Sequence, residues 1–467
     1  MNNKLEKTNE GERGKVPFIP DRSEMIYFII EKFKERDDNL ISSNGSFYFY
    51  ENSHWKQKDE FYVKKCLQDF AKELGIKEKE YKPYKKANDL YEQAKLDLFC
   101  EFETNRNVLN FPNGTYDLTT LEFRENRKED FIMYVLPYNY DPNATCPNWI
   151  NFINEILPEK DLRKLCPQVI AYPIANIHLE KIIYFYGLGR NGKSLTLDVI
   201  SDVLGKDNVS NVSLSNILKN DGLGLQQMEN KLINISAENL PTITDSSVLK
   251  TYTSGEALIV KKLFKDSYST INYPQTILAS NHLPQSKDYS FAFYNRLLIF
   301  PFNYTIPNDK INPNLKEELC QELPGICNWL LEGVKTLREN NKFSYSPTIE
   351  ALQNEYRIES DNVCTFIEEK MYTPSIYFKK LLKDIHKEFN DFCDENNYRT
   401  ISTKTLSNRL KGLGYKIDKS SGNKTYIWCE KKEINEIEFT ERIETPKDNS
   451  KYLEEKDLFE DQTETDF

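Results

Sequence analysis

The stretch that decides the fold is Lys181-Ile-Ile-Tyr-Phe-Tyr186, followed at once by Gly187-Leu-Gly-Arg-Asn-Gly-Lys-Ser194. The first part is an apolar run of strand length, and residues 195–204 have the apolar spacing of a helix. The octapeptide between them matches GxxxxGK[ST] in the strand-loop-helix setting that this phosphate-binding loop requires. Its glycines let backbone amides and the helix N-terminus face a bound phosphate.

This loop predicts a site for ATP and Mg²⁺. Lys193 is placed to reach the β and γ phosphates, and the Ser194 hydroxyl to bind Mg²⁺. The structural alternative is a glycine turn with an exposed lysine, but an accidental match in this setting is rare. The predicted nucleotide contacts are Gly187, Leu188, Gly189, Arg190, Asn191, Gly192, Lys193, Ser194 and Leu195.

Two further apolar runs end in polar side chains. Residues 231–237 end at Glu238, and residues 275–280 end at Asn281. An acid at the carboxyl end of a neighbouring parallel strand faces the crevice where sheet ligands bind, so Glu238 is a candidate to polarise water and hold the metal. Asn281 is a candidate to position water at the γ-phosphate. The alternatives are a solvated strand end for Glu238 and ordinary turn chemistry for Asn281.

A fourth apolar run, residues 297–302, is preceded by Arg296. Arginine can stabilise the charge of a transferring phosphoryl group, and in ring-shaped motors it commonly acts on the neighbouring subunit's nucleotide. A salt-bridged surface arginine is the alternative.

Apolar runs that alternate with helical segments predict an α/β fold with a parallel sheet between residues 146 and 345. Before it, helical stretches 25–34 and 61–74 flank an aromatic hairpin at 46–51 with Trp55 after its turn, and Asn113-Gly114 predicts a second hairpin turn. After it, helices at 376–390 and 401–411 and a hairpin at 415–428 predict a winged helix. The predicted division is a disordered segment 1–22, a small α+β domain 23–145, the α/β domain 146–345, a helical linker with the winged helix 346–430, and a disordered acidic tail 431–467.

Five blocks in this order resemble superfamily 3 helicases, most closely the phage and plasmid primase-helicase group related to the poxvirus primase-helicase. The blocks are 187–194, 235–238, 250–256 with 261–265, 277–284 and 294–297. Residues 109–118, 140–149, 323–329, Gly333 and 360–361 extend the resemblance to roughly residues 45–430. The resemblance implies an AAA+ type ATPase that forms a hexameric ring and unwinds DNA with 3′ to 5′ polarity.

Carried over by position, the resemblance makes Lys193 and Ser194 the ligands of nucleotide and Mg²⁺, and Glu238 the acidic Walker B residue. Asn281 becomes the sensor and Arg296 the arginine finger. The segments 257–262 and 267–273 predict a β-hairpin where the family contacts DNA. Its lysines are expected to grip phosphates, with a solvated charged hairpin as the alternative. The predicted DNA contacts here are Lys261, Lys262, Phe264 and Lys265.

Two features depart from the family pattern. Many relatives place a second acid beside the Walker B acid, whereas this chain has Asn239. Residues ahead of the ATPase carry no paired acidic strand motif, so we expect a helicase without primer synthesis that works with a separate primase or with host replication proteins.

Composition bounds the class of protein. The 467 residues carry a net charge of −11, of which residues 430–467 contribute −8. Because screening confines charge effects to about 10 Å, this acidity does not exclude DNA binding by a local basic surface. No apolar run is long enough for a membrane span or a signal peptide, and the nine cysteines form no CxxC pair. We therefore expect a cytoplasmic protein with reduced thiols and no zinc site.

The winged-helix segment carries further candidates for DNA contact, since such a helix can enter a major groove while the wing contacts phosphates. These candidates are Lys404, Arg409, Lys419 and Lys424. Winged helices also serve as packing or protein-docking modules. The prediction is a replicative helicase acting on single-stranded, forked or origin DNA. The alternatives are a site-specific initiator or regulator that uses ATP only to assemble, and a small-molecule P-loop kinase that would explain neither the hairpin lysines nor the C-terminal domain.

Overall fold

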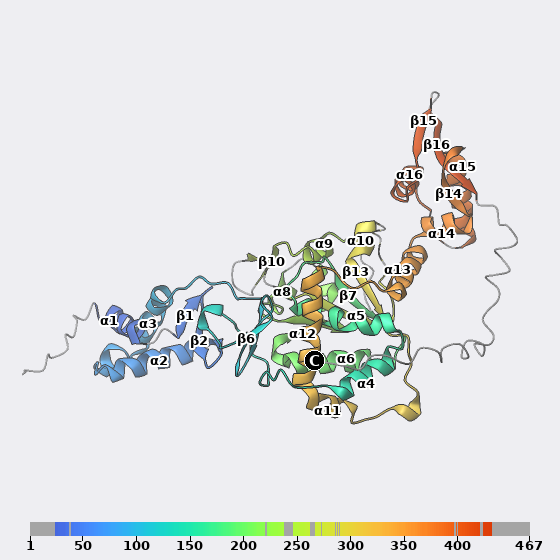
Figure 1. Cartoon of the computed structure of the whole chain (residues 1–467). Helices are drawn as coiled ribbons and strands as arrows, with labels where there is room; N and C mark the ends of the chain where they lie inside the picture. Colours follow the sequence, from blue (N-terminus) through green and yellow to red (C-terminus); the bar gives the residue numbers. More distant parts are fainter. Residues whose placement is uncertain are drawn as a thin grey trace, which may run out of the picture. The chain divides into compact units, whose positions relative to one another are not determined.

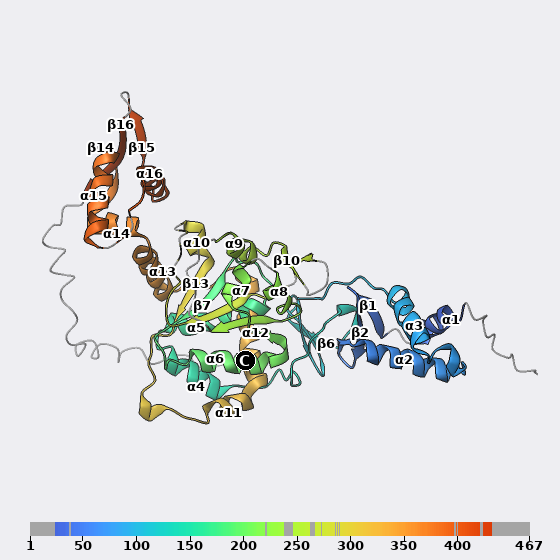
Figure 2. The same cartoon turned by 180° about the vertical axis from the view of Figure 1, so that it is seen from behind.

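The computed structural model describes residues 24–36, 39–219, 222–237, 246–261, 267–271, 273–284, 286, 288, 290–396, 398, 400–420 and 424–431. By its internal contacts the chain divides into two compact units, Met1–Gln353 and Asn354–Phe467. Figure 1 and Figure 2 show the elements of both units from opposite sides.

The first unit begins with a helical lobe around a three-stranded antiparallel sheet. Its elements are α1 (Met25–Arg36), β1 (Leu40–Ser43), β2 (Ser46–Glu51), β3 (His54–Lys58), α2 (Glu60–Glu73) and α3 (Tyr84–Asp97). The predicted aromatic hairpin is confirmed, because Tyr50 pairs with Trp55 across β2 and β3. Phe33 of α1, Phe47 of β2 and Leu67 of α2 pack in one apolar core.

A second antiparallel sheet joins this lobe to the larger core. It consists of β4 (Val108–Phe111), β5 (Gly114–Asp117) and β6 (Glu122–Arg124). Because Phe111 pairs with Gly114, the tight turn is Pro112-Asn113, one residue earlier than the predicted Asn113-Gly114. Gly114 instead begins β5, where a Cβ atom would come within 2.6 Å of the Arg124 carbonyl oxygen. The predicted boundary at residue 145 remains a prediction, although one core cluster runs from Val108 to Ile349.

The centre of the first unit is a five-stranded parallel sheet with the order β13-β7-β12-β9-β8. The strands are β7 (Ile182–Tyr186), β8 (Val209–Ser210), β9 (Ile233–Ala237), β12 (Thr276–Ser280) and β13 (Leu297–Pro301). Nearly every residue of the four longer strands is buried, as expected for parallel strands covered on both faces. The predicted α/β fold with a parallel sheet is confirmed and is consistent with a P-loop core.

One core cluster joins this sheet to four helices: α4 (Pro147–Ile156), α5 (Lys160–Ala171), α6 (Lys193–Leu204) and α12 (Leu323–Asn340). Gly333 of α12 lies so close to α5 that a Cβ atom there would meet the Pro167 carbonyl oxygen at 2.3 Å. The helices therefore pack at a distance that only glycine permits.

The strand order corrects one expectation. β9, which precedes Glu238, is not the neighbour of β7, because β12 lies between them and pairs with both. Consequently Asn281, rather than Glu238, follows the strand beside the phosphate-binding loop.

Shorter elements surround the sheet. They are α7 (Leu214–Leu218), α8 (Leu223–Gln226), α9 (Ser247–Thr253), α10 (Phe291–Arg296), α11 (Leu315–Leu319) and the hairpin of β10 (Leu258–Val260) with β11 (Tyr268–Thr270). The predicted pairing of this hairpin is confirmed by the register of Leu258 with Thr270.

The helix α13 (Pro347–Ser360) leads into the second unit, which contains α14 (Asn362–Glu369), β14 (Tyr372–Leu381), α15 (Leu382–Glu395), α16 (Thr403–Gly412), β15 (Ile417–Ser420) and β16 (Lys424–Lys431). The strands form an antiparallel sheet with the order β14-β16-β15. The predicted second helix and C-terminal hairpin are confirmed. The predicted helix at 376–390 is wrong over its first six residues, because Lys379 and Lys380 pair with β16 and the helix begins at Leu382.

Three features of the described part of the chain bear on the class of protein. None of its helices combines the length and apolar character that a bilayer crossing requires. None of the nine cysteines, all of which lie in it, forms a disulfide. It contains no group of three or more His, Cys, Asp or Glu side chains arranged to hold a metal ion.

Candidate functional site

The loop between β7 and α6 adopts the backbone conformations that its glycines predict. Gly189, Arg190 and Gly192 all have positive φ angles, of 109°, 49° and 82°. Gly192 is the N-cap of α6, so the loop leads directly into the amino end of a helix. Backbone amides of such a loop and helix start converge on one point and favour an anion there.

Two of the glycines are also required by close contacts. A Cβ atom on Gly187 would lie 2.5 Å from the Phe302 carbonyl oxygen, and one on Gly192 would lie 2.9 Å from Ile156. The side chain of Asn191 donates a hydrogen bond to the same Phe302 oxygen at 3.0 Å. The segment after β13 therefore fixes the loop from outside.

A second connection fixes the outer side of the loop. The Arg190 guanidinium donates a hydrogen bond to Asn308 Oδ1 at 2.7 Å. The backbone carbonyl oxygen of Arg190 accepts a hydrogen bond from the amide of Ile306. The loop therefore keeps its conformation through contacts with the protein itself.

Lys193 is held in the centre of the loop. Its side chain is 5% exposed, and its Nζ donates to Gly187 O at 2.6 Å, Asn191 Oδ1 at 3.0 Å and Asn281 Oδ1 at 3.3 Å. Burial lowers the pKa of the Lys193 ammonium group. These three acceptors are neutral oxygens. An ammonium held by neutral oxygens can exchange one of them for an anionic phosphate oxygen with a gain in electrostatic energy.

Asn281 reaches Lys193 because β12 lies beside β7, with Ser280 opposite Tyr186. Both polar residues thus lie at the carboxyl edge of the sheet, where parallel sheets bind ligands. The Tyr184 hydroxyl donates to the His282 carbonyl oxygen and so ties the turn after Asn281 to β7. The structure brings together two of the four predicted catalytic residues.

Ser194 faces a hollow of about 320 Å³ between α6 and the carboxyl end of β9. Asp198, Ser236 and Ala237 also line this hollow. Glu238 follows Ala237 directly in the chain but lies outside the described residues. The hydroxyl of Ser194 and the carboxylate of Asp198 are oxygen groups of the kind that Mg²⁺ prefers, so the described lining of this hollow is compatible with that ion.

Arg296 lies at the opposite edge of the sheet. It ends α10, and the next residue, Leu297, pairs with Ile182 at the amino end of β7. The phosphate-binding loop follows the carboxyl end of β7. The two ends of β7 are roughly 13 Å apart, at about 3.3 Å per residue. Arg296 therefore does not face its own chain's loop.

The Arg296 guanidinium is fixed by contacts within its own chain. It donates to Thr253 Oγ1 at 3.1 Å and to Ser254 Oγ at 3.3 Å, and it pairs with Glu180 at 3.0 Å. Its side chain is 16% exposed.

Sequence reasoning missed the pair formed by Lys250 and Asp288. Lys250 Nζ donates to Asp288 at 2.7 Å, and Ser246 donates to the same carboxylate. Burial alone would raise the pKa of Asp288, but hydrogen bonds from Lys250, Ser246 and Ser290 hold it well below its ordinary value. The pair joins α9 to the turn after β12. No spacing signal predicts it, since the partners are 38 residues apart.

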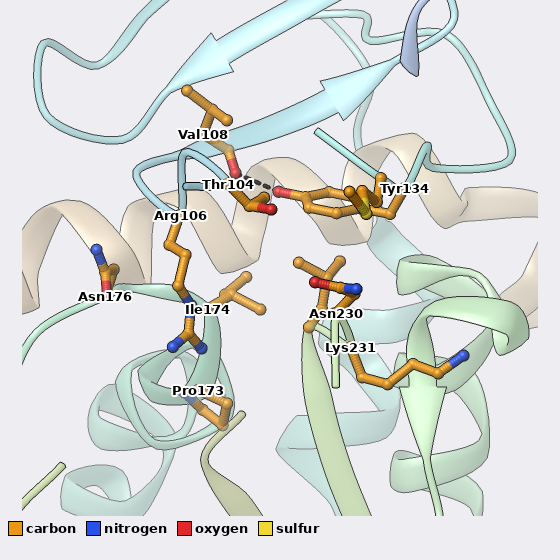
Figure 3. Close-up of a pocket in the computed structure, with 11 residues that line it drawn as sticks. Thr104, Arg106, Val108, Tyr134, Pro173, Ile174, Asn176, Asn230 and Lys231 are labelled. Carbon is orange, nitrogen blue, oxygen red and sulfur yellow. Dashed lines mark hydrogen bonds between the residues drawn. The ribbon is translucent and has the colours of Figure 1, made fainter. Parts of the chain in front are cut away.

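Sequence reasoning also missed Arg106, which links the hairpin to the segment before β4. Its guanidinium donates to the carbonyl oxygens of Ile271 at 3.5 Å and Tyr273 at 3.1 Å, just after β11. Figure 3 shows it beside a hollow of about 30 Å³ next to Tyr134, whose hydroxyl donates to Val108 O at 2.5 Å. Burial lowers the pKa of Arg106. It is thus a half-buried cation at the base of the hairpin.

The hairpin residues predicted to contact DNA are only partly described. Lys261 is exposed, and its backbone amide donates to Gly222 O at 3.1 Å. Lys262, Phe264 and Lys265 lie outside the described residues.

In the second unit, three of the four predicted DNA contacts are exposed, namely Lys404, Lys419 and Lys424. Arg409 is not: its side chain is 14% exposed and pairs with Asp361, the N-cap of α14. It also donates to Asn362 at 3.0 Å. Arg409 therefore holds α16 against α14.

Two protein-family models match the chain. Residues 27–158 match the model described as D5 N terminal like, and residues 185–296 match one described as a family of unknown function, DUF5906. The first runs from α1 in the helical lobe to the end of α4, and the second begins in β7 and ends at Arg296.

Viral proteins are among the relatives. "Putative helicase 121R" of Invertebrate iridescent virus 3 is 24% identical over 243 residues, which are 48% of this chain and 26% of that protein. "Putative helicase L207/L206" of Acanthamoeba polyphaga mimivirus is 22% identical over 228 residues, 46% of this chain and 24% of that protein. The matched part of each relative is about a quarter of its length. Among solved structures, the apo C-terminal region of NrS-1 aligns with a TM-score of 0.49 and 12% identity, over 86% of this chain and 98% of that chain.

Proposed function

We propose that the chain is an ATP-dependent DNA helicase of superfamily 3, similar to the viral primase-helicases that its motifs resemble. It opens duplex DNA in the replication of a phage, plasmid or other mobile genetic element. The names of the viral relatives support a helicase-type enzyme, while nucleotide, polarity and assembly are parts of the proposal.

The observation that carries the proposal is the contact of Lys193 with Asn281 at the carboxyl edge of β7 and β12. A glycine turn with an exposed lysine, the alternative to a phosphate-binding loop, does not bury its lysine to 5%. The loop is also fixed by contacts with the segment after β13, so its binding groups are preorganised for an anion.

In this proposal the chain's own residues bind and orient the triphosphate. Lys193 donates hydrogen bonds to β- and γ-phosphate oxygens. Asn281 forms a hydrogen bond with the attacking water and so positions it. Ser194 and Glu238 would hold Mg²⁺, which would supply positive charge to offset the charge of the phosphates. Glu238 also polarises the water as the acidic Walker B residue.

The place of Arg296 supports an assembly in which neighbouring subunits share each site. An arginine finger must reach the γ-phosphate, and Arg296 lies at the amino edge of its own sheet. We propose that it exchanges its contacts with Glu180, Thr253 and Ser254 for the nucleotide of an adjoining protomer, in a hexameric AAA+ ring around DNA with 3′ to 5′ polarity. A ring of head-to-tail contacts presents one protomer's amino edge to the next protomer's carboxyl edge.

DNA contact is assigned to two places. The first is the sequence between β10 and β11, which contains Lys261, Lys262, Phe264 and Lys265. The second unit, which we interpret as a winged helix, contributes Lys404, Lys419 and Lys424. Arg409 is excluded from this set because it pairs with Asp361.

The test is strand release from a forked duplex with Mg·ATP. Wild type should release the strand, and Lys193→Ala should abolish both release and hydrolysis. Lys335→Ala, an exposed lysine of α12, is the matched control and should leave both unchanged. Site-specific binding without strand release would overturn the proposal in favour of an initiator, and hydrolysis insensitive to DNA would favour a small-molecule kinase.

A further inference from the structure

The open face of the β14-β16-β15 sheet combines aromatic rings with lysines. In β16 the buried residues Ile427 and Cys429 pack with α15 and α16, so Tyr426 and Trp428 point to the opposite face. Lys379 pairs with Trp428 across the sheet, and its Nζ lies 4.8 Å from the centre of the Tyr426 ring. We call the side chains of Tyr426, Trp428, Lys379 and Lys416 the aromatic-lysine face.

The lysines of this face are exposed and hold the rings only weakly. Lys416 Nζ lies 5.2 Å from the Trp428 ring centre, and its side chain is 68% exposed. Such exposed contacts between a cation and a ring are weak, so a phosphate can replace the ring as the partner of the ammonium group. Two acids share the face, Glu430 and Asp418. Asp418 is occupied, because it accepts from Trp428 Nε1 at 2.9 Å and pairs with Lys416 at 3.4 Å.

Beside this face, β14 has a bulge of exposed apolar side chains. The register of β14 against β16 shifts between Pro374 and Lys379. Ile376, Tyr377 and Phe378 are 77%, 80% and 62% exposed. The Ser375 hydroxyl accepts hydrogen bonds from the amides of Tyr377 and Phe378, at 3.2 and 3.1 Å, and so fixes the bulge. Three consecutive exposed apolar residues on a fixed bulge indicate a binding surface rather than packing.

We propose that the aromatic-lysine face and the bulge bind single-stranded nucleic acid, with bases stacked on the rings and phosphates held by Lys379 and Lys416. Rings and lysines interleaved in this way suit an unpaired strand, because every base has a face to stack and every linkage has a phosphate. This inference deepens the proposed function and rests on its DNA substrate, but it does not depend on ATP.

Ring spacing favours an unpaired strand over a duplex. Tyr426 and Trp428 are two residues apart on one strand, which places their Cα atoms about 6.8 Å apart. Bases stacked in a duplex are only about 3.4 Å apart and are closed to rings from the side. A base can therefore lie on each ring only if the strand is unstacked.

The experiment measures affinity of the full-length chain, without nucleotide, for two labelled probes: an oligothymidylate and an abasic oligonucleotide of the same length. Trp428→Leu should weaken binding of the oligothymidylate by about 5- to 150-fold, the range for loss of one stacked base. It should change binding of the abasic probe by less than about twofold. Trp428→Phe keeps a ring and should restore most of the affinity, which separates stacking from a loss of fold.

The bulge and the lysines have their own variants. The double variant Tyr377→Ala, Phe378→Ala should weaken binding of the oligothymidylate and not of the abasic probe. Tyr84→Ala, which removes an 81% exposed ring of α3, should change the affinity for neither probe. Lys379→Ala should weaken both probes and lower the salt slope by about 0.7, the value for one phosphate on a single strand.

Equal losses for both probes, tighter binding of a duplex of the same sequence, or no loss with Trp428→Leu would overturn the inference. The first two results would indicate that the surface binds duplex or the nucleic-acid backbone. The third would indicate that it binds an acidic protein or no partner. If strand release by wild type fails while base-dependent binding persists, the helicase proposal falls and this surface stands. If release persists without base-dependent binding, only this inference falls.

Discussion

At the scale of single residues, the contact between Lys193 and Asn281 joins two residues that the sequence predicts separately. Lysine and asparagine come from segments 88 residues apart, and the parallel pairing of β7 with β12 brings them within 3.3 Å. The sequence predicts Lys193 in the loop after one buried strand and Asn281 directly after another. Their contact depends on strand order, which no local pattern records.

Asn281→Ala should separate binding from turnover. Lys193 retains Gly187 O and Asn191 Oδ1 as acceptors, so Mg·ATP affinity should change by less than about fivefold. The hydrolysis rate should fall by about 10- to 1000-fold, because the water loses its orienting amide. Steady-state kinetics and calorimetric titration give the two quantities. Asn295→Ala, an exposed asparagine of α10, is the control and should leave the rate constant within about twofold. A parallel loss of affinity and rate would contradict the assigned role.

The pair of Lys250 with Asp288 predicts a dependence of stability on pH. The folded-state pKa of Asp288 is lowered below the unfolded value of about 3.9. Its contribution is therefore fully present above the unfolded pKa and is lost as pH falls through the folded pKa. We expect Asp288→Asn to lower the free energy of unfolding by about 1–2 kcal/mol at pH 7, since Lys250 is partly exposed, and by less at pH 3. Urea titrations at both values check this. An equal difference at both pH values would contradict it.

At the scale of elements, the parts most readily predicted are those that local chemistry controls. The loop at 187–194 has its strand before it and its helix after it because glycine, lysine and apolar spacing all favour that arrangement. The hairpin of β10 and β11 follows from alternating apolar residues. Both are confirmed.

Elements that depend on distant pairing were predicted less well. Residues 376–381 contain Ile, Tyr, Phe and two lysines, and they read equally well as a helix start or a strand. The pairing of β14 with β16, some 50 residues later, selects the strand. In the same way β12 enters the sheet between β7 and β9, although it follows both in the chain. Neither choice is encoded within one window of sequence.

The hairpin should depend on Arg106 for its position. Arg106 donates to two carbonyl oxygens that follow β11, so its loss frees the base of the hairpin. We expect Arg106→Met to reduce the stimulation of hydrolysis by DNA at least about fivefold, with the rate in the absence of DNA unchanged within about twofold. The ratio of the two rates is the measurement. Equal losses of both rates would instead indicate general damage to the ATPase core.

At the scale of the whole molecule, the two ends of the sheet carry different halves of the proposed chemistry. The carboxyl edge holds Lys193 and Asn281, while the amino edge holds Arg296. In the proposed mechanism a single protomer binds a triphosphate but lacks a group that the reaction requires. This division makes activity a property of the interface between subunits.

The most direct test of that claim is hydrolysis by mixtures of two inactive variants, Glu238→Gln and Arg296→Ala. Each homogeneous preparation should be inactive while still binding Mg·ATP. Mixed in equal amounts, they should recover up to about a quarter of the wild-type rate, since about one interface in four pairs an intact acid with an intact arginine. Absence of recovery at every ratio, with mixed rings shown to form, would contradict the account.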